Sequence, residues 1–215
     1  QKLAIVGATC SGKTTVVNLL TRFYDIDGGS ITLDGESIYD IPKKKLRGSI
    51  GIVLQDTVIF NDTIMQNIRY GRLDATDEEV IAAAKTAKVA DFAEKMSDGY
   101  DTMLTEGGGN LSQGQRQLIA IARAVLADPK ILILDEATSS IDTRTEVHIQ
   151  EAMLALMKGR TSLIIAHRLS TIRDADKIVV IDGGQVVEAG NHEKLLSENG
   201  AYARLYNTQF AGIKT

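Results

Sequence analysis

Short apolar runs alternate with one-sided helical stretches along most of the chain. Runs rich in Ile, Val and Leu predict strands buried on both faces at Leu3–Val6, Ile50–Leu54, Ile131–Leu134, Leu163–Ala166 and Ile178–Ile181. This alternation is typical of a mostly parallel sheet with crossover helices, so we predict an α/β fold. Gly183 and Gly184 separate the last run from Gln185–Glu188 and predict a tight hairpin, which adds an antiparallel pair late in the sheet.

The helices are predicted by apolar spacing and by capping residues. Apolar positions at i, i+3, i+4 and i+7 predict a helix near the N-terminus whose buried face holds Val16, Leu19, Leu20 and Phe23. Thr76 and Glu79 have the spacing of a capping box and predict the start of a second helix. Ser112 and Gln115 have the same spacing and predict the start of a third.

Composition narrows the class of protein. The 215 residues carry a net charge of -4 and 44 % of them are hydrophobic, as in ordinary soluble globular domains. The acidic balance argues against a general nucleic-acid partner. The single cysteine, Cys10, cannot form an internal disulfide and favours a reducing compartment. The apolar runs are far shorter than the roughly 18 to 20 residues of a membrane-spanning helix, so we expect no span.

A glycine-rich loop lies between the first predicted strand and the first predicted helix. Its sequence GATCSGKT fits the phosphate-loop (P-loop) pattern G-x-x-x-x-G-K-[ST], in which backbone N–H groups and a helix start face the phosphates. Lys13 is expected to contact the β- and γ-phosphates and Thr14 to offer its hydroxyl to Mg²⁺. The alternative is an ordinary glycine turn with a solvated lysine. The expected nucleotide-binding residues are Gly7, Ala8, Thr9, Cys10, Ser11, Gly12, Lys13, Thr14 and Thr15.

Polar residues follow several predicted strands at their carboxyl ends, where open α/β sheets bind ligands. Asp135 suits the Mg²⁺ shell, and Glu136 suits a catalytic base for the water that attacks the γ-phosphate. A pair of acids that caps the next helix is the alternative interpretation. His167 is placed to donate a hydrogen bond to the γ-phosphate, and Gln55 offers a neutral oxygen at a similar strand end.

A short motif before the acidic strand connects these residues to a family. Leu111–Gln115 reads LSQGQ and is close to the LSGGQ signature of ABC transporters. With the phosphate loop, a Q-loop at Gln55, a Walker B strand at Ile131–Glu136, a D-loop at Ser139–Asp142 and a switch histidine at His167, the chain resembles the nucleotide-binding domain of that family over essentially its whole length. Segments such as Phe60–Ile64 and Thr105–Gly107 resemble the exporter branch.

The resemblance implies an ATPase that works as a head-to-tail dimer with a second nucleotide-binding domain. ATP and Mg²⁺ would be held between the P-loop of one copy and the signature of the other, with Ser112, Gln113, Gly114, Gln115 and Asp142 on the partner's side. Lys13, Gln55, Glu136 and His167 would be catalytic, and Thr14, Gln55 and Asp135 would hold the metal. The domain would couple hydrolysis to export through a transmembrane domain on the same polypeptide, at the cytoplasmic face of the membrane.

The resemblance also implies a domain organisation. Residues 1–55 and 128–215 would form a RecA-like core, and residues from about 56 to 127 a helical subdomain that carries the signature. An antiparallel β-subdomain would be truncated, because the family's N-terminal strands and adenine-stacking aromatic residue would lie upstream of Gln1.

Two positions depart from the family pattern. Cys10 stands where the family usually has glycine, and Gln113 replaces a glycine of the signature. A side chain at Cys10 has to adopt a backbone shape that glycine adopts more easily, which would weaken nucleotide binding. The alternative is that this small side chain is tolerated, since the motif allows any residue at that position. These departures give some support to an alternative function: a regulatory ATP-binding half of a heterodimeric exporter, with little hydrolysis of its own.

Overall fold

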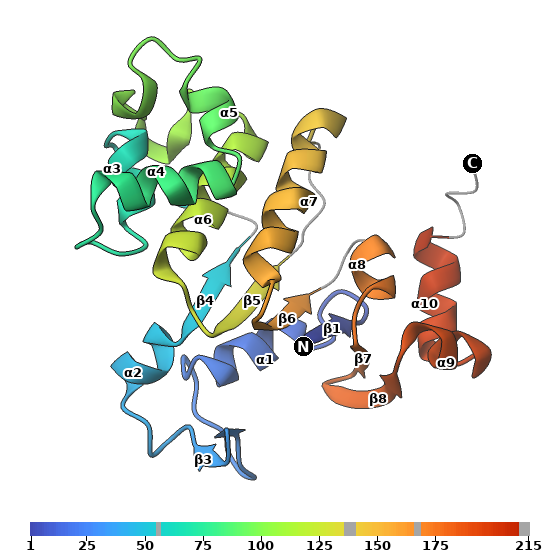
Figure 1. Cartoon of the computed structure of the whole chain (residues 1–215). Helices are drawn as coiled ribbons and strands as arrows, with labels where there is room; N and C mark the ends of the chain where they lie inside the picture. Colours follow the sequence, from blue (N-terminus) through green and yellow to red (C-terminus); the bar gives the residue numbers. More distant parts are fainter. Residues whose placement is uncertain (55–56, 136–140, 166–168, 211–215) are drawn as a thin grey trace. The chain divides into compact units, whose positions relative to one another are not determined.

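The computed structural model describes residues 1–54, 57–135, 141–165 and 169–210 (Figure 1). The chain divides into two compact units. The first unit contains Gln1–Ile50, Lys130–Ala137 and Thr161–Thr215. The second contains Gly51–Pro129 and Thr138–Arg160. Strand β4 (Ile50–Val53) begins at the last residue of the first segment.

A mostly parallel sheet forms the first unit. Strand β1 (Lys2–Val6) pairs in parallel with β6 (Thr161–Ile165) on one side and with β7 (Lys177–Asp182) on the other. Strand β5 (Ile131–Asp135) extends the sheet in parallel beyond β6, and β8 (Gln185–Gly190) pairs antiparallel with β7. The order within this unit is β5-β6-β1-β7-β8, which confirms the predicted α/β class and the predicted antiparallel hairpin.

The core of the first unit joins the sheet to helix α1 (Lys13–Leu20). Apolar side chains from one face of the strands pack on one side of this helix, and removing them from water stabilises the unit. The buried residues of this cluster are Ile5, Val17, Ile133, Leu163, Ile165 and Ile181. The cluster therefore holds the end of β1 and the start of α1 at a fixed spacing, which is where the predicted phosphate loop lies.

Helix α1 is shorter than its apolar spacing predicts. It ends at Leu20, and the prediction that Phe23 lies on its buried face was wrong, because that ring is 61 % exposed. Arg22 has a left-handed backbone with a φ of 54°, and its guanidinium donates to the carbonyl oxygens of Ile38 at 3.0 Å and Ile41 at 3.2 Å. These contacts with a later part of the chain fix the turn after α1, and apolar periodicity carries no trace of them.

A small lobe follows α1 in the first unit. Strands β2 (Thr32–Leu33) and β3 (Glu36–Ser37) form an antiparallel pair, and helix α2 (Lys43–Gly48) begins at the lysine run. Ile38, Leu46 and their apolar neighbours form a second buried cluster there. The antiparallel pair agrees with the predicted fold class.

The second unit is helical. Its helices are α3 (Ile64–Arg69), α4 (Asp77–Thr86), α5 (Ala90–Ala93), α6 (Gln113–Ala127) and α7 (Thr143–Met157), with 3-10 turns at Gly99–Asp101 and Glu106–Gly108. Helix α6 contacts α3, α4 and α7. Both predicted capping boxes are present, so the predicted helix starts at Thr76 and Ser112 are confirmed.

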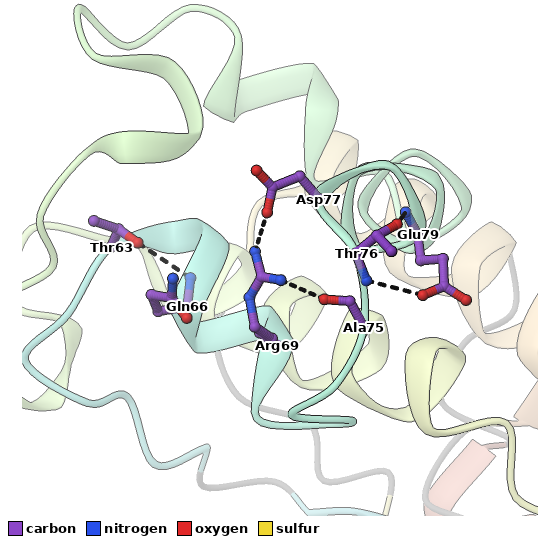
Figure 2. A network of polar contacts seen from close by, with 7 residues as sticks. All are labelled: Thr63, Gln66, Arg69, Ala75, Thr76, Asp77 and Glu79. Atoms are coloured by element: carbon purple, nitrogen blue, oxygen red, sulfur yellow. Dashed lines mark hydrogen bonds and ion pairs between the residues drawn. The ribbon is translucent and has the colours of Figure 1, made fainter.

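The corner between α3 and α4 is held by charged and capping side chains (Figure 2). The guanidinium of Arg69 donates to the carbonyl oxygen of Ala75 and pairs with the carboxylate of Asp77. The N–H of Thr76 donates to the Glu79 carboxylate at 2.9 Å, and the N–H of Glu79 donates to the Thr76 hydroxyl at 3.3 Å. Arg69 thus joins the end of α3 to the start of α4, and the capping box of Thr76 and Glu79 stabilises that start.

The C-terminal helices complete the first unit: α8 (Leu169–Arg173), α9 (His192–Ser197) and α10 (Ala201–Phe210). The Glu188 carboxylate accepts the N–H of Tyr202 at 2.9 Å at the start of α10, and the Tyr202 hydroxyl lies 2.7 Å from Nδ1 of His192. Burial raises the pKa of Tyr202 to about 12, and its contact with His192 joins α9 to α10. In the described part of the chain, no helix is long and apolar enough to cross a membrane.

Candidate functional site

The P-loop connects β1 to α1 through two residues with left-handed backbones. Cys10 has a φ of 63° and Gly12 a φ of 109°. A third residue, Gly7, has no room for a side chain, because a Cβ there would lie 2.3 Å from the carbonyl oxygen of Ile181. The loop therefore packs tightly against the end of β7 and turns sharply into the helix.

The start of α1 differs in its capping from the starts of α6 and α7. The N-cap of α1 is Gly12, and no side-chain cap bonds to it. Ser112 and Asp142 cap α6 and α7 with side-chain hydrogen bonds. The first N–H groups of a helix lack partners within the helix, and together with the helix dipole they favour a bound anion. The P-loop thus presents backbone donors to a phosphate.

Lys13 and Ser11 add polar side chains to this loop. The Lys13 ammonium donates to the carbonyl oxygens of Gly7 at 2.9 Å and Ala8 at 2.8 Å, and the residue is only 9 % exposed. Burial lowers the pKa of Lys13, and the charge of Asp135 opposes this shift. The Ser11 hydroxyl is buried and has no hydrogen-bond partner in the described structure. A buried cation and an unpaired hydroxyl fit a phosphate group.

Asp135 lies at the same edge of the sheet as the P-loop. Asp135 on β5 and Ile5 on β1 are both paired with Ile165, from opposite sides of β6. Thr14 is exposed in the first turn of α1. No group of three or more His, Cys, Asp or Glu residues able to hold a metal occurs among the described residues. A single carboxylate and a hydroxyl fit Mg²⁺ that is bound mainly by phosphate oxygens and water.

The β7–β8 hairpin supports the P-loop, which the sequence did not predict. The N–H of Gly184 donates to the carbonyl oxygen of Ser11 at 3.0 Å. A Cβ on Gly12 would lie 3.5 Å from the Cα of Gly184, so the two glycines are in close contact. The glycines of the hairpin were predicted from turn chemistry alone. Their contact with a loop so far away in the chain has no signal in the sequence.

The signature-like residues lie in the second unit, at the adjoining starts of two helices. The Ser112 hydroxyl accepts the N–H of Gln115 at 3.2 Å, and Oε1 of Gln115 accepts the N–H of Ser112 at 2.8 Å. Asp142 accepts the N–H of Thr145 at 3.0 Å, and this bond lowers the pKa of Asp142. A Cβ on Gly114 would lie 2.2 Å from Cγ2 of Thr145. The structure thus brings the predicted residues of α6 and α7 together.

The exposure of the signature differs along its length. Ser112 is exposed, Gln113 is half-buried and Gly114 is buried. The Ser112 side chain is therefore accessible to a ligand although it also caps α6. Gln55, Glu136 and His167, which were predicted to be catalytic, lie outside the described residues, as do Ser139 and Ser140 of the predicted D-loop.

The fold and the loop define the class of protein. A parallel sheet whose first strand leads through GATCSGKT into a helix, with Asp135 at the end of a nearby strand, is the architecture of a P-loop nucleotide-binding domain.

The comparisons with known proteins give the family. Residues 1–139 match the sequence profile of the ABC transporter family. The chain belongs to this family, and the predicted resemblance is confirmed. The chain is 58 % identical over 210 residues to an uncharacterised ABC transporter ATP-binding protein of Bacillus subtilis (strain 168). The aligned residues cover 98 % of the chain and 35 % of that protein. It is 55 % identical over 203 residues to a fatty acid ABC transporter ATP-binding/permease protein of Mycobacterium bovis (strain ATCC BAA-935 / AF2122/97), covering 94 % of the chain and 32 % of that protein.

A solved structure agrees with the fold. A bacterial Atm1-family ABC exporter with ATP bound is similar with a TM-score of 0.91 and 48 % identity, and the match covers 100 % of the chain and 37 % of the exporter chain. The chain spans about a third of the length of the curated relatives it matches. The part matched in the exporter is a nucleotide-binding domain in fold, as predicted.

Proposed function

We propose that this chain is the ATP-binding and ATP-hydrolysing motor domain of an ABC exporter. The observation that carries the proposal is the P-loop: the start of α1 has no side-chain cap, and the buried Lys13 ammonium lies beside it. The loop offers backbone donors and a cation to the phosphates of ATP without any rearrangement of the sheet. We further propose that the helical residues from about 56 to 127 form the subdomain that carries the signature.

The chain's own residues divide the chemistry of hydrolysis. Lys13 would bind the β- and γ-phosphates, because an ammonium stabilises the charge that develops on the oxygens during phosphoryl transfer. Thr14 and Asp135, with Gln55, would hold Mg²⁺, which neutralises phosphate charge when it is bound. Glu136 would take a proton from the attacking water, and His167 would donate a hydrogen bond to the γ-phosphate.

The other half of the nucleotide site would come from a second nucleotide-binding domain. Ser112 is exposed at the start of α6, and its hydroxyl and the helix start would form a second anion-binding surface once the hydroxyl turns from its capping contact to a phosphate. A head-to-tail dimer would place this surface on the triphosphate held by the P-loop of the partner. The name of the mycobacterial relative joins ATP binding to a permease, which supports a transmembrane domain on the same polypeptide and a place at the cytoplasmic face of a membrane.

Replacement of Glu136 tests the catalytic assignment. In the full-length protein, Glu136→Gln should lower ATP turnover by about 10²- to 10⁴-fold, because the amide cannot accept the proton of water, while ATP binding remains. Glu193→Gln, an exposed residue of α9 in the same unit, is the matched control and should leave turnover unchanged. Turnover of Glu136→Gln equal to that of the control would show that ATP hydrolysis does not use Glu136 as its base.

A further inference from the structure

A pocket in the second unit borders the signature-like residues, of which Gln115 lines it, and contains no residue of the P-loop. It has a volume of about 480 Å³ and opens between α5, α6 and α7. Sites for small molecules in proteins span roughly 300 to 1,000 Å³, so the pocket has the size of a ligand site. Its wall has an apolar part, made by the half-buried ring of Phe92 and by Leu118, which is 2 % exposed.

The rest of the wall contains the basic side chains of Lys88, Lys95, Arg144 and His148, together with the carboxylate of Asp91. Lys88 forms an ion pair with Glu151 at 3.0 Å, and Nδ1 of His148 lies 3.6 Å from the carboxylate of Asp91. These two basic side chains of the pocket already face carboxylates. The charge of Lys88 is therefore largely compensated within the protein.

Two further cations line the same pocket without such compensation. Lys95 follows α5, and Arg144 lies in the first turn of α7. Neither forms an ion pair with a carboxylate in the part of the chain that the structure describes. The nearby carboxylate of Asp142 accepts the N–H of Thr145 at 3.0 Å. Two uncompensated cations at one pocket favour a negatively charged ligand there.

We propose that this pocket binds a small organic anion. The apolar body of the ligand lies against Phe92 and Leu118, and its anionic group lies between Lys95 and Arg144. An aromatic sulfonate or phosphate and an aliphatic carboxylate share this chemistry. Both combine an apolar contact with charge-assisted hydrogen bonds, which are stronger than neutral ones.

The position of the pocket suggests what the ligand does. Gln115, Arg144 and Thr145 of the pocket wall belong to the first turns of α6 and α7, directly beside Ser112 and Asp142. A bound anion would join these turns to the segment after α5 and so alter the signature. This regulatory effect rests on the proposed function, whereas the binding itself does not.

Calorimetry on the full chain tests the binding with two probes, 2-naphthalenesulfonate and octanoate. At least one should bind, and Lys95→Gln/Arg144→Gln should weaken it at least about tenfold. The matched control Lys44→Gln/Lys45→Gln removes the same charge from exposed positions of α2 and should leave the affinity unchanged. Lys13→Ala, which removes the cation of the P-loop, should also leave it unchanged. That result would separate this pocket from the nucleotide site.

The probes also identify the source of the ligand. Binding of the sulfonate alone supports an aromatic anion, and binding of octanoate alone supports an aliphatic carboxylate. Three outcomes overturn the proposal: no binding of either probe, equal weakening in the Lys44/Lys45 control, or equally tight binding of the neutral counterparts 2-naphthol and octanol.

Discussion

At the scale of single residues, the P-loop contains a conflict between side chain and backbone. Cys10 holds a φ of 63° in an exposed position of the loop. A residue with a Cβ pays roughly 1 to 2 kcal/mol for the left-handed conformation, whereas glycine adopts it without that penalty. Since the thiol is exposed, buried packing does not offset this strain. The loop keeps its shape because Gly7, Gly12 and the β7–β8 hairpin hold it.

Substitutions at Cys10 test this strain. Cys10→Val should lower the free energy of unfolding by about 1 kcal/mol or more relative to Cys10→Gly, because a branched Cβ is the least suited to this backbone. Urea unfolding measures the difference, and Cys10→Gly should bind ATP at least as tightly as the unaltered chain. Asp34→Gly, at another positive φ of 51° in the β2–β3 turn, is the control and should leave ATP affinity unchanged. Equal stability of the Gly and Val variants would contradict the account.

The sequence predicts the loop itself better than it predicts what supports the loop. The motif at residues 7–14 requires particular residue types at fixed local spacing, so Lys13 and Thr14 could be assigned from sequence alone. The hydrogen bond from Gly184 to Ser11 is a tertiary contact, and local spacing holds no information about it. The same limit applies to the packing of Gly7 against Ile181.

At the scale of elements, the contact between α6 and α7 depends on one missing side chain. Gly114 lies in the first turn of α6, and a Cβ there would lie 2.2 Å from Cγ2 of Thr145 and 3.2 Å from Cγ2 of Ile141. Two helix starts can approach this closely only where one residue has no side chain. Gly114 is thus required by packing, independently of any contact with a nucleotide.

A pair of substitutions separates packing from other effects at this contact. Gly114→Ala should lower the free energy of unfolding by about 1 to 2 kcal/mol, because overpacking outweighs the better helix propensity of alanine. Thr145→Ser removes the methyl group that the new Cβ would meet, so adding Gly114→Ala to Thr145→Ser should cost little or nothing. A thermal or urea melt of the four chains measures this coupling. The same cost of Gly114→Ala in both backgrounds would rule out the steric explanation.

Element starts were predicted more accurately than element ends. Capping boxes are local, so Thr76 and Ser112 could be recognised as helix starts from residues three positions apart. The end of α1 was missed because Arg22 bonds to the carbonyl oxygens of Ile38 and Ile41, which belong to the next lobe. Tertiary contacts of this kind override helical periodicity.

At the scale of the whole molecule, the candidate nucleotide residues are divided between two units. The P-loop and Asp135 belong to the first unit, and Ser112 and Asp142 belong to the second. The first group contains the uncapped start of α1, and the second contains the start of α6, where Ser112 is exposed and also caps the helix. In the head-to-tail dimer that we propose, two copies of the domain each supply half of one nucleotide site. The family resemblance supplied this expectation, since one chain does not reveal the symmetry of its assembly.

The most direct test of this central claim mixes two inactive variants of the full-length protein. Lys13→Ala removes the phosphate-binding cation, and Ser112→Asp keeps a helix cap but places a negative charge toward the triphosphate. Each variant alone should hydrolyse ATP poorly. In an equal mixture, half of the dimers pair the two variants and each of these has one intact composite site, so ATP turnover should recover to about a quarter of the unaltered level. Turnover of the mixture no higher than the mean of the two variants would show that a single copy encloses the nucleotide by itself.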